Sequence, residues 1–337
     1  MLILGVESSC DDTGVAVYDA AARKILASKI RSQDAVHGPF GGVVPELASR
    51  AHLENIGALY RDALQAAGAQ PGDLNEIAVT RGPGLRGCLA VGVAFARGLG
   101  AGLRIPVRGI NHIHAHALSP FAESELPPLP HLAGVVSGGH THFFAVRGPD
   151  DFTLLAKTRD DAMGEAFDKV AKLLGLPWPG GPAVDRAAES GNDKAFPFPG
   201  VRFNRDPDTL DLSFSGLKTA ALHRVRDAGI ARLQPGEPPD AAHRDLCASF
   251  QRAAVELVIG RAESLLARDG FRSFSFSGGA AQNSRLRRRA AELAAETGAP
   301  VFFPGRGLSV DNGAMIAACC ALTGATAAPE IDPDLKL

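Results

Sequence analysis

Two similar segments, each an apolar strand, a polar turn and a returning strand, constrain the fold of this chain more than any other feature. The first spans residues 2–18 with its turn at Ser8–Gly14, and the second spans residues 132–146 with its turn at Ser137–Thr141. The segments lie about 130 residues apart, and a repeated unit at such a separation predicts a duplicated domain. We therefore expect two related domains within one chain.

A third glycine turn, Ser277–Ala280, follows the alternating strand 274–276. It leads into a predicted helix, with Asn283 near the start and Gly298 just past the end. The chain therefore contains three glycine or small-residue turns, each directly after a predicted strand.

Helical and strand patterns alternate along the rest of the chain. Pro45 suits the first turn of a helix that ends near Gly68, and a strand at 77–79 precedes an Ala/Gly-rich helix. Such alternation predicts a layered α/β protein. Prolines interrupt the pattern near 118–131, and we place a domain boundary there. The expected parts are an N-terminal domain at 1–120, a C-terminal domain at 131–325 and a tail at 326–337.

Charge and cysteine content narrow the class of protein. The chain has 337 residues and a formal net charge of −2, so a nucleic-acid partner must bind a local basic patch. Its five cysteines are odd in number and scattered, which favours reduced thiols in a cytoplasmic protein. The N-terminus reaches an acid at Glu7, and no apolar run is long enough for a bilayer, so we expect neither a signal peptide nor a membrane partner.

Three histidines within five residues, His112, His114 and His116, suggest a metal site. On a helix His112 and His116 lie one turn apart on one face, and two imidazoles at that spacing can share an ion. His114 points elsewhere. Ile113 follows His112 where a His-Glu-x-x-His protease needs its catalytic Glu, so the motif argues against that chemistry.

The small-residue turns suggest a second kind of site. Backbone N–H groups in a tight turn of small residues can face an anion, and two such hairpins can hold a nucleotide phosphate from opposite sides. One Gly-Gly turn is a weak signal, but three turns in a duplicated plan resemble the actin, hexokinase and Hsp70 superfamily. This resemblance implies an α/β fold with two domains, each a mixed β-sheet flanked by helices.

Further motifs make the resemblance specific. They are Gly5–Thr13, Gly41–Arg50, Asn111–His116, Val136–Thr141, Gly164–Lys169, Pro179–Pro182, Phe214–Thr219, Ser277–Gly279 with Asn283, and Asp311–Met315. From about residue 2 to residue 320 the chain resembles the bacterial tRNA N6-adenosine threonylcarbamoyltransferase family. The motifs are numerous, occur in the family's order and are individually rare.

The resemblance implies an enzyme that moves the threonylcarbamoyl group of threonylcarbamoyl-AMP to N6 of adenosine 37, in tRNAs reading codons that start with A. It implies that His112, His116 and Asp311 hold one divalent ion per subunit, expected to be iron(II). Through that ion these three residues are the expected catalytic group. The implied protein partners are TsaB and TsaE.

The family's substrate-binding positions map onto nine residues of this chain. They are Val136, Ser137, Gly138, Gly139, His140, Asp168, Gly181, Asp185 and Asn283. Carboxylates suit ribose hydroxyls, as acidic residues do in dinucleotide sites, and an Asn side chain offers both a donor and an acceptor to an adenine or ribose edge.

The chain also departs from the family pattern. Asp12 stands where the family has Glu, so its carboxylate reaches one methylene less far, and His114 and His142 replace other residues. A basic run on one predicted helix has two interpretations, a solvated face or a contact to tRNA phosphate. The run consists of Arg285, Arg287, Arg288 and Arg289.

Two alternative functions remain open at this point. A metalloprotease would use the His-x-x-x-His spacing, but it gives the phosphate-binding turns no role. A non-catalytic nucleotide-binding partner would use the turns, but it has no need of a metal group made by His112, His116 and Asp311.

Overall fold

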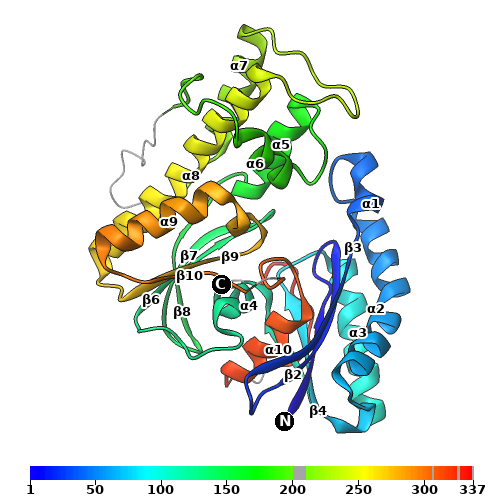
Figure 1. The fold of residues 1–337 in the computed structure, drawn as a ribbon. Helices are drawn as coiled ribbons and strands as arrows, with labels where there is room; N and C mark the ends of the chain where they lie inside the picture. The colour runs from blue at the N-terminus through cyan, green and yellow to red at the C-terminus, as the bar shows by residue number, and fades with distance from the viewer. Residues whose placement is uncertain (200–209, 306, 325–326, 336–337) are drawn as a thin grey trace. The chain divides into compact units, whose positions relative to one another are not determined.

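The computed structural model describes residues 1–199, 210–305, 307–324 and 327–335 (Figure 1). The chain forms two compact units. Unit 1 contains Met1–Pro127, Arg147–Phe152 and Phe303–Leu337, and unit 2 contains Pro128–Val146 and Thr153–Phe302. Each unit is built around one sheet, and each is described by itself below.

The sheet of unit 1 is mixed and five-stranded, in the order β3-β2-β1-β4-β5. β1 pairs antiparallel with β2 and parallel with β4, β2 is antiparallel to β3, and β4 is parallel to β5. The strands are β1 (Leu2–Glu7), β2 (Asp12–Asp19), β3 (Lys24–Ser32), β4 (Leu74–Gly82) and β5 (Val107–Asn111). The carboxyl ends of the three parallel strands therefore lie at one edge of this sheet.

Helices cover both faces of the first sheet because strand side chains alternate between its faces. Figure 1 shows α2 and α3 on one side of this sheet and α10 on the other. Leu4 and Val6 share a core with residues of α2 and α3, whereas Ile3 shares a second core with residues of α10. α2 begins with Pro45 and is followed by Gly68 in the left-handed region, at φ 65°, as predicted. The helices of unit 1 are α1 (Asp34–His37), η1 (Gly38–Phe40), α2 (Pro45–Ala67), η2 (Pro71–Asp73), α3 (Arg86–Leu103), α4 (His112–Leu118), η3 (Ser119–Phe121) and α10 (Gly313–Leu322).

The second sheet repeats the plan of the first. Its order is β10-β9-β6-β7-β8, with β6 antiparallel to β7 and parallel to β9, and β9 parallel to β10. The strands are β6 (His131–Val136), β7 (Thr141–Gly148), β8 (Asp151–Lys157), β9 (Ser273–Ser277) and β10 (Val301–Phe302). The duplicated α/β domain predicted from the two strand–turn–strand segments is confirmed.

The helices of unit 2 enclose an apolar core with several aromatic rings, among them Phe167 and Phe250, whose centroids are 5.0 Å apart. The predicted helix after the third glycine turn is α9, with Asn283 as its N-cap and Gly298 beyond its end at φ 71°. The helices are α5 (Met163–Leu174), α6 (Gly180–Ala188), α7 (Ser215–Asp227), α8 (Ala241–Asp269), η4 (Gly279–Gln282) and α9 (Ser284–Thr297).

The units differ from the predicted domain boundaries at the C-terminal end. The prediction placed all of 131–325 in the second domain, whereas residues from Phe303 onward belong to unit 1. The reason is tertiary: α10 is buried along most of its length and packs against the first sheet. Gly313 lies so close to β1 that an added Cβ would stand 2.6 Å from the Gly5 carbonyl oxygen. The predicted boundary between 325 and 326 lies outside the described residues.

In the part of the chain that the structure describes, no helix is both long and apolar enough to cross a membrane.

Candidate functional site

The two histidines of the opening motif stand on α4, directly after β5. The Asn111 side chain caps this helix, because its Oδ1 accepts hydrogen bonds from the N–H groups of Ile113 (2.8 Å) and His114 (3.3 Å). His112 and His116 then lie one turn apart, with ring centroids separated by 4.6 Å at an interplanar angle of 85°. Both side chains are buried. The predicted helical placement of the pair is confirmed.

Asp311 joins the histidines from a segment 195 residues further along the chain than His116. Its Oδ1 lies 2.9 Å from His116 Nε2 and 3.6 Å from His112 Nε2. The next residue, Asn312, caps α10 by accepting the Met315 N–H at 2.8 Å. The cap and the close packing of Gly313 against β1 together hold Asp311 at the start of this helix.

These three side chains could hold a metal ion, since one potential ligand atom from each lies within 4.8 Å of the others. Two imidazoles and one carboxylate form a donor set that suits several divalent transition metals and leaves coordination positions open. His114 is not part of the group. Its ring stacks on Phe152 at 4.1 Å and 7°, and burial lowers its pKa to about 4.

A buried acid, Glu7, lies beside this group of three residues. It belongs to the sequence motif Gly5–Thr13, but no role was predicted for it. Glu7, the last residue of β1, is fully buried, and its Oε2 lies 3.0 Å from His112 Nδ1. Burial alone would raise the pKa of Glu7, but the charge and hydrogen bond of His112 lower it below its usual value. Burial alone would lower the pKa of His112, but the charges of Asp311 and Glu7 raise it to about 9. The sequence signal that could have identified Glu7 as a functional residue is an acid at the end of an otherwise apolar strand.

Asp12, the residue that departs from the family pattern, opens β2. Burial raises its pKa to about 8, with further contributions from the negative charges of Asp311 and Asp11. The shorter side chain therefore stands in a region already rich in carboxylates. Asp12 is not one of the three residues of the metal-binding group.

In unit 2 the second small-residue turn, between β6 and β7, contains four of the nine predicted substrate residues, and a fifth precedes it. Ser137 closes it: its N–H donates to the His140 carbonyl at 2.8 Å, and its Oγ accepts the His140 N–H at 3.1 Å. Gly138 and Gly139 are exposed, and a Cβ added at either would meet no atom within 4 Å. The fold itself therefore has room for a side chain at both positions. A ligand that approaches the backbone closely would explain why both residues are glycine. The fifth residue, Val136, ends β6.

The other four predicted substrate residues lie in the same unit, on α6, on α5 and before α9. Asp168 on α5 accepts the Gly180 N–H at 2.7 Å, which holds the start of α6 and places Gly181 in its first turn. Asp185 accepts from Asn283 Nδ2 at 3.3 Å and from Ser284 N at 3.1 Å. The turn after β6 and the η4 segment after β9, which has Asn283 as its C-cap, follow the carboxyl ends of two parallel strands. That edge is where open α/β sheets bind ligands.

A cavity of about 320 Å³ adjoins the Asp185 cluster. Two of its lining residues, Gln251 and Ser284, donate side-chain hydrogen bonds to Asp185. Arg285 and Arg288 line the same cavity. A polar cavity of this size next to predicted nucleotide contacts suits part of a small, hydrogen-bonding ligand.

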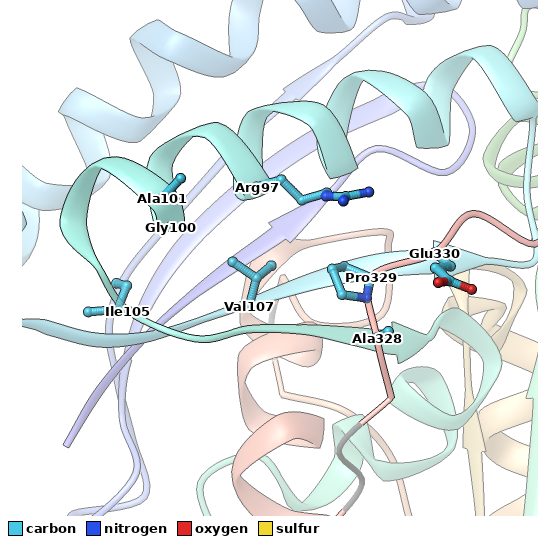
Figure 2. A pocket seen from close by; sticks show the side chains of 8 residues that line it. All are labelled: Arg97, Gly100, Ala101, Ile105, Val107, Ala328, Pro329 and Glu330. Carbon is cyan, nitrogen blue, oxygen red and sulfur yellow. The ribbon is translucent and has the colours of Figure 1, made fainter.

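A second cavity, also of about 320 Å³, lies in unit 1 between α3, β5 and the segment that follows α10 (Figure 2). Figure 2 shows Val107, Pro329 and Glu330 around it, with Arg97 extending from α3. It contains none of the predicted site residues, and its lining combines small and aliphatic residues with the charged Arg97 and Glu330.

Most of the remaining histidines and arginines of the sequence prediction have structural partners. His131 is buried between the hydroxyls of Ser273 and Ser275, each 2.8 Å from a ring nitrogen. The ring centroids of His140 and His142 are 5.3 Å apart. In the basic run, Arg285 pairs with Asp193 at 2.8 Å and Arg289 with Glu256 at 2.9 Å, and Arg287 donates to a backbone carbonyl.

Comparison with known proteins agrees with the sequence motifs. A family model described as TsaD, tRNA N6-adenosine threonylcarbamoyltransferase, matches residues 24–318. A protein of that name from Chromobacterium violaceum is 46% identical over 94% of this chain and 91% of its own length. Another, from Paracoccus denitrificans, is 48% identical over 94% of this chain and 87% of its own.

A solved structure supports the fold. Component A of the (R)-2-hydroxyglutaryl-CoA dehydratase of Acidaminococcus fermentans superposes with a TM-score of 0.55, covering 96% of this chain and 98% of that one at 16% identity. At this identity the likeness concerns the fold alone. It agrees with the predicted α/β fold of two domains with duplicated mixed sheets.

Proposed function

We propose a mechanism for this chain, which belongs to the tRNA N6-adenosine threonylcarbamoyltransferase family. The chain is a transferase that acts on tRNA and forms N6-threonylcarbamoyladenosine. We propose that the donor is threonylcarbamoyl-AMP and that the acceptor is adenosine 37 of tRNAs reading codons that start with A. The adenosine N6 forms a bond to the carbamoyl carbon and releases one of its protons to solvent water, while the bond from that carbon to the phosphate oxygen breaks and AMP leaves as an anion.

The convergence of His112, His116 and Asp311 is the observation that carries the catalytic part of the proposal. These residues would hold one divalent ion per subunit, and we propose iron(II) because imidazole and carboxylate donors with open positions suit it. When bound, the ion supplies a Lewis acid for the carbamoyl group. The helix caps Asn111 and Asn312 keep the three side chains in place before any ligand arrives.

The loops of unit 2 would bind the AMP part of the donor. Backbone N–H groups of Gly138 and Gly139 are open to solvent and can donate to the phosphate, and His140 closes the same turn. Asp168, Gly181 and the Asp185–Asn283 pair would contact the ribose and adenine. Because AMP leaves as an anion, donors to its phosphate stabilise the transition state as well as the bound donor.

Protein partners and compartment belong to the proposal too. By family resemblance we propose that the chain works with TsaB and TsaE in the cytoplasm. All five cysteines are free thiols, which agrees with a reducing compartment.

The test is complementation of a strain depleted of the protein. Wild type, His112→Ala, Asp311→Ala and the control His223→Ala, an exposed histidine of α7, would each be expressed, and nucleosides of bulk tRNA measured by mass spectrometry. We expect threonylcarbamoyladenosine with wild type and the control, and little with the other two. Full restoration by His112→Ala and Asp311→Ala would refute the catalytic role of the metal group.

A protease would need a different site. The residue after His112 is Ile113, a buried aliphatic side chain that cannot act as a general base. Cleavage of a protein substrate by purified wild type, lost in His112→Ala, would contradict this conclusion.

A further inference from the structure

We propose that Glu7 is a positioning residue that holds the ring proton of His112 on Nδ1 and fixes the orientation of the ring, so that Nε2, on the side of Asp311, would be the nitrogen that gives up its proton and binds the ion. This inference rests on the proposed metal role of His112, His116 and Asp311. It assigns a function to a residue that lies next to the metal-binding group without belonging to it.

The pairing of three parallel strands brings Glu7 to His112. β1 pairs with β4 through Val6 and Val79, so the next residues, Glu7 and Thr80, both reach the carboxyl edge of the sheet. β4 pairs with β5 through Thr80 and Ile110, and two residues later His112 opens α4. Strand register therefore places a carboxylate, a hydroxyl and an imidazole in one row at this edge.

Three donors converge on the Glu7 carboxylate. Oε1 accepts the Ser9 N–H at 2.5 Å, and Oε2 accepts the Thr80 hydroxyl at 2.5 Å and the Nδ1–H of His112 at 3.0 Å. A buried carboxylate is costly unless it is satisfied in this way. With a backbone amide and a hydroxyl already donating, the carboxylate faces His112 purely as an acceptor, and the imidazole must present a proton at Nδ1.

The two imidazoles of the centre are held in different ways. His112 Nδ1 is tied to Glu7, and His112 Nε2 lies 3.6 Å from Asp311. His116 Nε2 lies 2.9 Å from Asp311, while its buried Nδ1 makes no hydrogen bond within the described residues. A carboxylate behind a metal-binding imidazole fixes the ring and increases its basicity. Only His112 has such a carboxylate among the described residues, so it should be the ligand whose affinity depends on a second residue.

Wild-type protein alone gives the first test. Selective ¹⁵N-histidine labelling of the Zn²⁺-loaded chain, with zinc as a diamagnetic probe, would report the protonation of each ring nitrogen by NMR. We expect a slowly exchanging, downfield proton on His112 Nδ1, identified by its proximity to Thr80. A His112 proton on Nε2, with metal bound through Nδ1, would overturn the proposal without any substitution.

Substitution gives the second test. Glu7→Gln should weaken Fe²⁺ binding, measured by anaerobic equilibrium dialysis, by about 10- to 100-fold, the usual effect of removing a residue that orients a metal ligand. The matched control is Glu76→Gln, which alters another buried acid of the same sheet, one paired with Arg108 and absent from the metal-binding group. The control should bind Fe²⁺ as wild type does.

The outcomes separate this inference from the proposed function. If wild type binds no Fe²⁺ or Zn²⁺, the metal proposal fails. If wild type binds metal and folded Glu7→Gln binds it equally well, with the His112 resonance unchanged, the role of Glu7 fails alone. Should Glu7→Gln not fold, the wild-type NMR measurement decides, and Thr80→Val, which keeps the carboxylate but removes one donor, should shift the same Nδ1 resonance.

Discussion

At the carboxyl end of β1 the chain turns through Ser8–Asp11, whereas at the corresponding end of β6 it turns through Ser137–His140, which contains Gly138 and Gly139. Both strands sit in the middle of a five-stranded sheet with the same order of neighbours. The first turn follows a buried acid, Glu7, and stands in unit 1 with the two histidines of the candidate metal site. The second turn has open backbone and stands in unit 2 with a polar cavity.

The comparison separates what the duplicated fold determines from what the loops determine. In both units the predicted functional side chains gather at the carboxyl ends of parallel strands, the edge at which ligands bind in open α/β sheets. The residues placed there differ: two imidazoles and a carboxylate converge in unit 1, whereas unit 2 has exposed glycines and an Asp–Asn pair. A duplicated framework thus carries two different sets of candidate functional residues on the segments that connect its strands and helices.

The largest expected effect is loss of a metal ligand from unit 1. Asp311→Ala should lower kcat/KM on the order of 10³-fold, because a Lewis acid contributes several kcal/mol and each 1.36 kcal/mol is tenfold in rate. Bound metal, measured by elemental analysis, should fall together with activity. Asp62→Ala, at an exposed acid of α2, should leave both unchanged. If Asp311→Ala loses metal but keeps its activity, unit 1 does not supply the catalytic chemistry.

A substitution in the β6–β7 turn of unit 2 should leave metal binding unchanged. Gly138→Ala adds a Cβ where the protein has open space, so the free energy of unfolding should change by less than about 0.5 kcal/mol. If the donor phosphate approaches this backbone, kcat/KM should fall roughly 10- to 100-fold, because displacement by about 1 Å can cost that much.

The control for this glycine is Gly98→Ala. Gly98 also has open space, but it lies on α3 in unit 1, away from any predicted contact. Its activity should equal that of wild type. If Gly138→Ala and Gly98→Ala are equally active, the β6–β7 turn does not bind the donor phosphate.

Features of the fold could be predicted from the sequence where they depend on neighbouring residues, and could not where they depend on residues far apart in the chain. The strand–turn–strand segments are local patterns of apolar residues, and so the duplicated sheets and the caps at Asn283 and Gly298 could be predicted. The proximity of Asp311 to His116 could not be derived from spacing, because the two are 195 residues apart, and only the resemblance to a family implied it.

The C-terminal boundary of the second unit and the role of Glu7 both depend on contacts between residues that are distant in the sequence. Residues 303–324 return to unit 1 because Gly313 and Gly5 allow α10 to approach the sheet closely, a tertiary contact that composition does not encode. Glu7 meets His112 only through the register of β1, β4 and β5. A sequence pattern identifies a buried strand but not which residue of the next strand will lie beside it.

A third prediction concerns pH and the second sheet. β6 begins with His131, whereas β1 begins with Leu2. Burial lowers the pKa of His131 to about 3. Below its usual pKa of about 6.5, the unfolded chain therefore binds a proton that the native state does not, and stability falls as pH falls from that value toward 3.

Urea unfolding followed by a probe in unit 2 would measure this effect. His131→Gln should be less stable at pH 7, because it loses hydrogen bonds to Ser273 and Ser275. Between pH 7 and pH 5, however, it should lose about 2 kcal/mol less than wild type does. Equal losses in the two proteins would mean that His131 is not held neutral in the native state.

The smallest expected effect tests whether the basic run of α9 gives unit 2 a contact with tRNA. Three of its four arginines have protein partners, and Arg288 is exposed with no ion pair within the described residues. A solvated arginine should contribute little, so Arg288→Ala should change tRNA affinity by less than about twofold. Its salt dependence should also match wild type, because loss of a phosphate contact would reduce the slope of log K against log salt by about 1. A reduced slope in Arg288→Ala, without a change in fold by circular dichroism, would instead assign part of the RNA surface to α9 and extend the chemistry of unit 2 beyond the donor nucleotide.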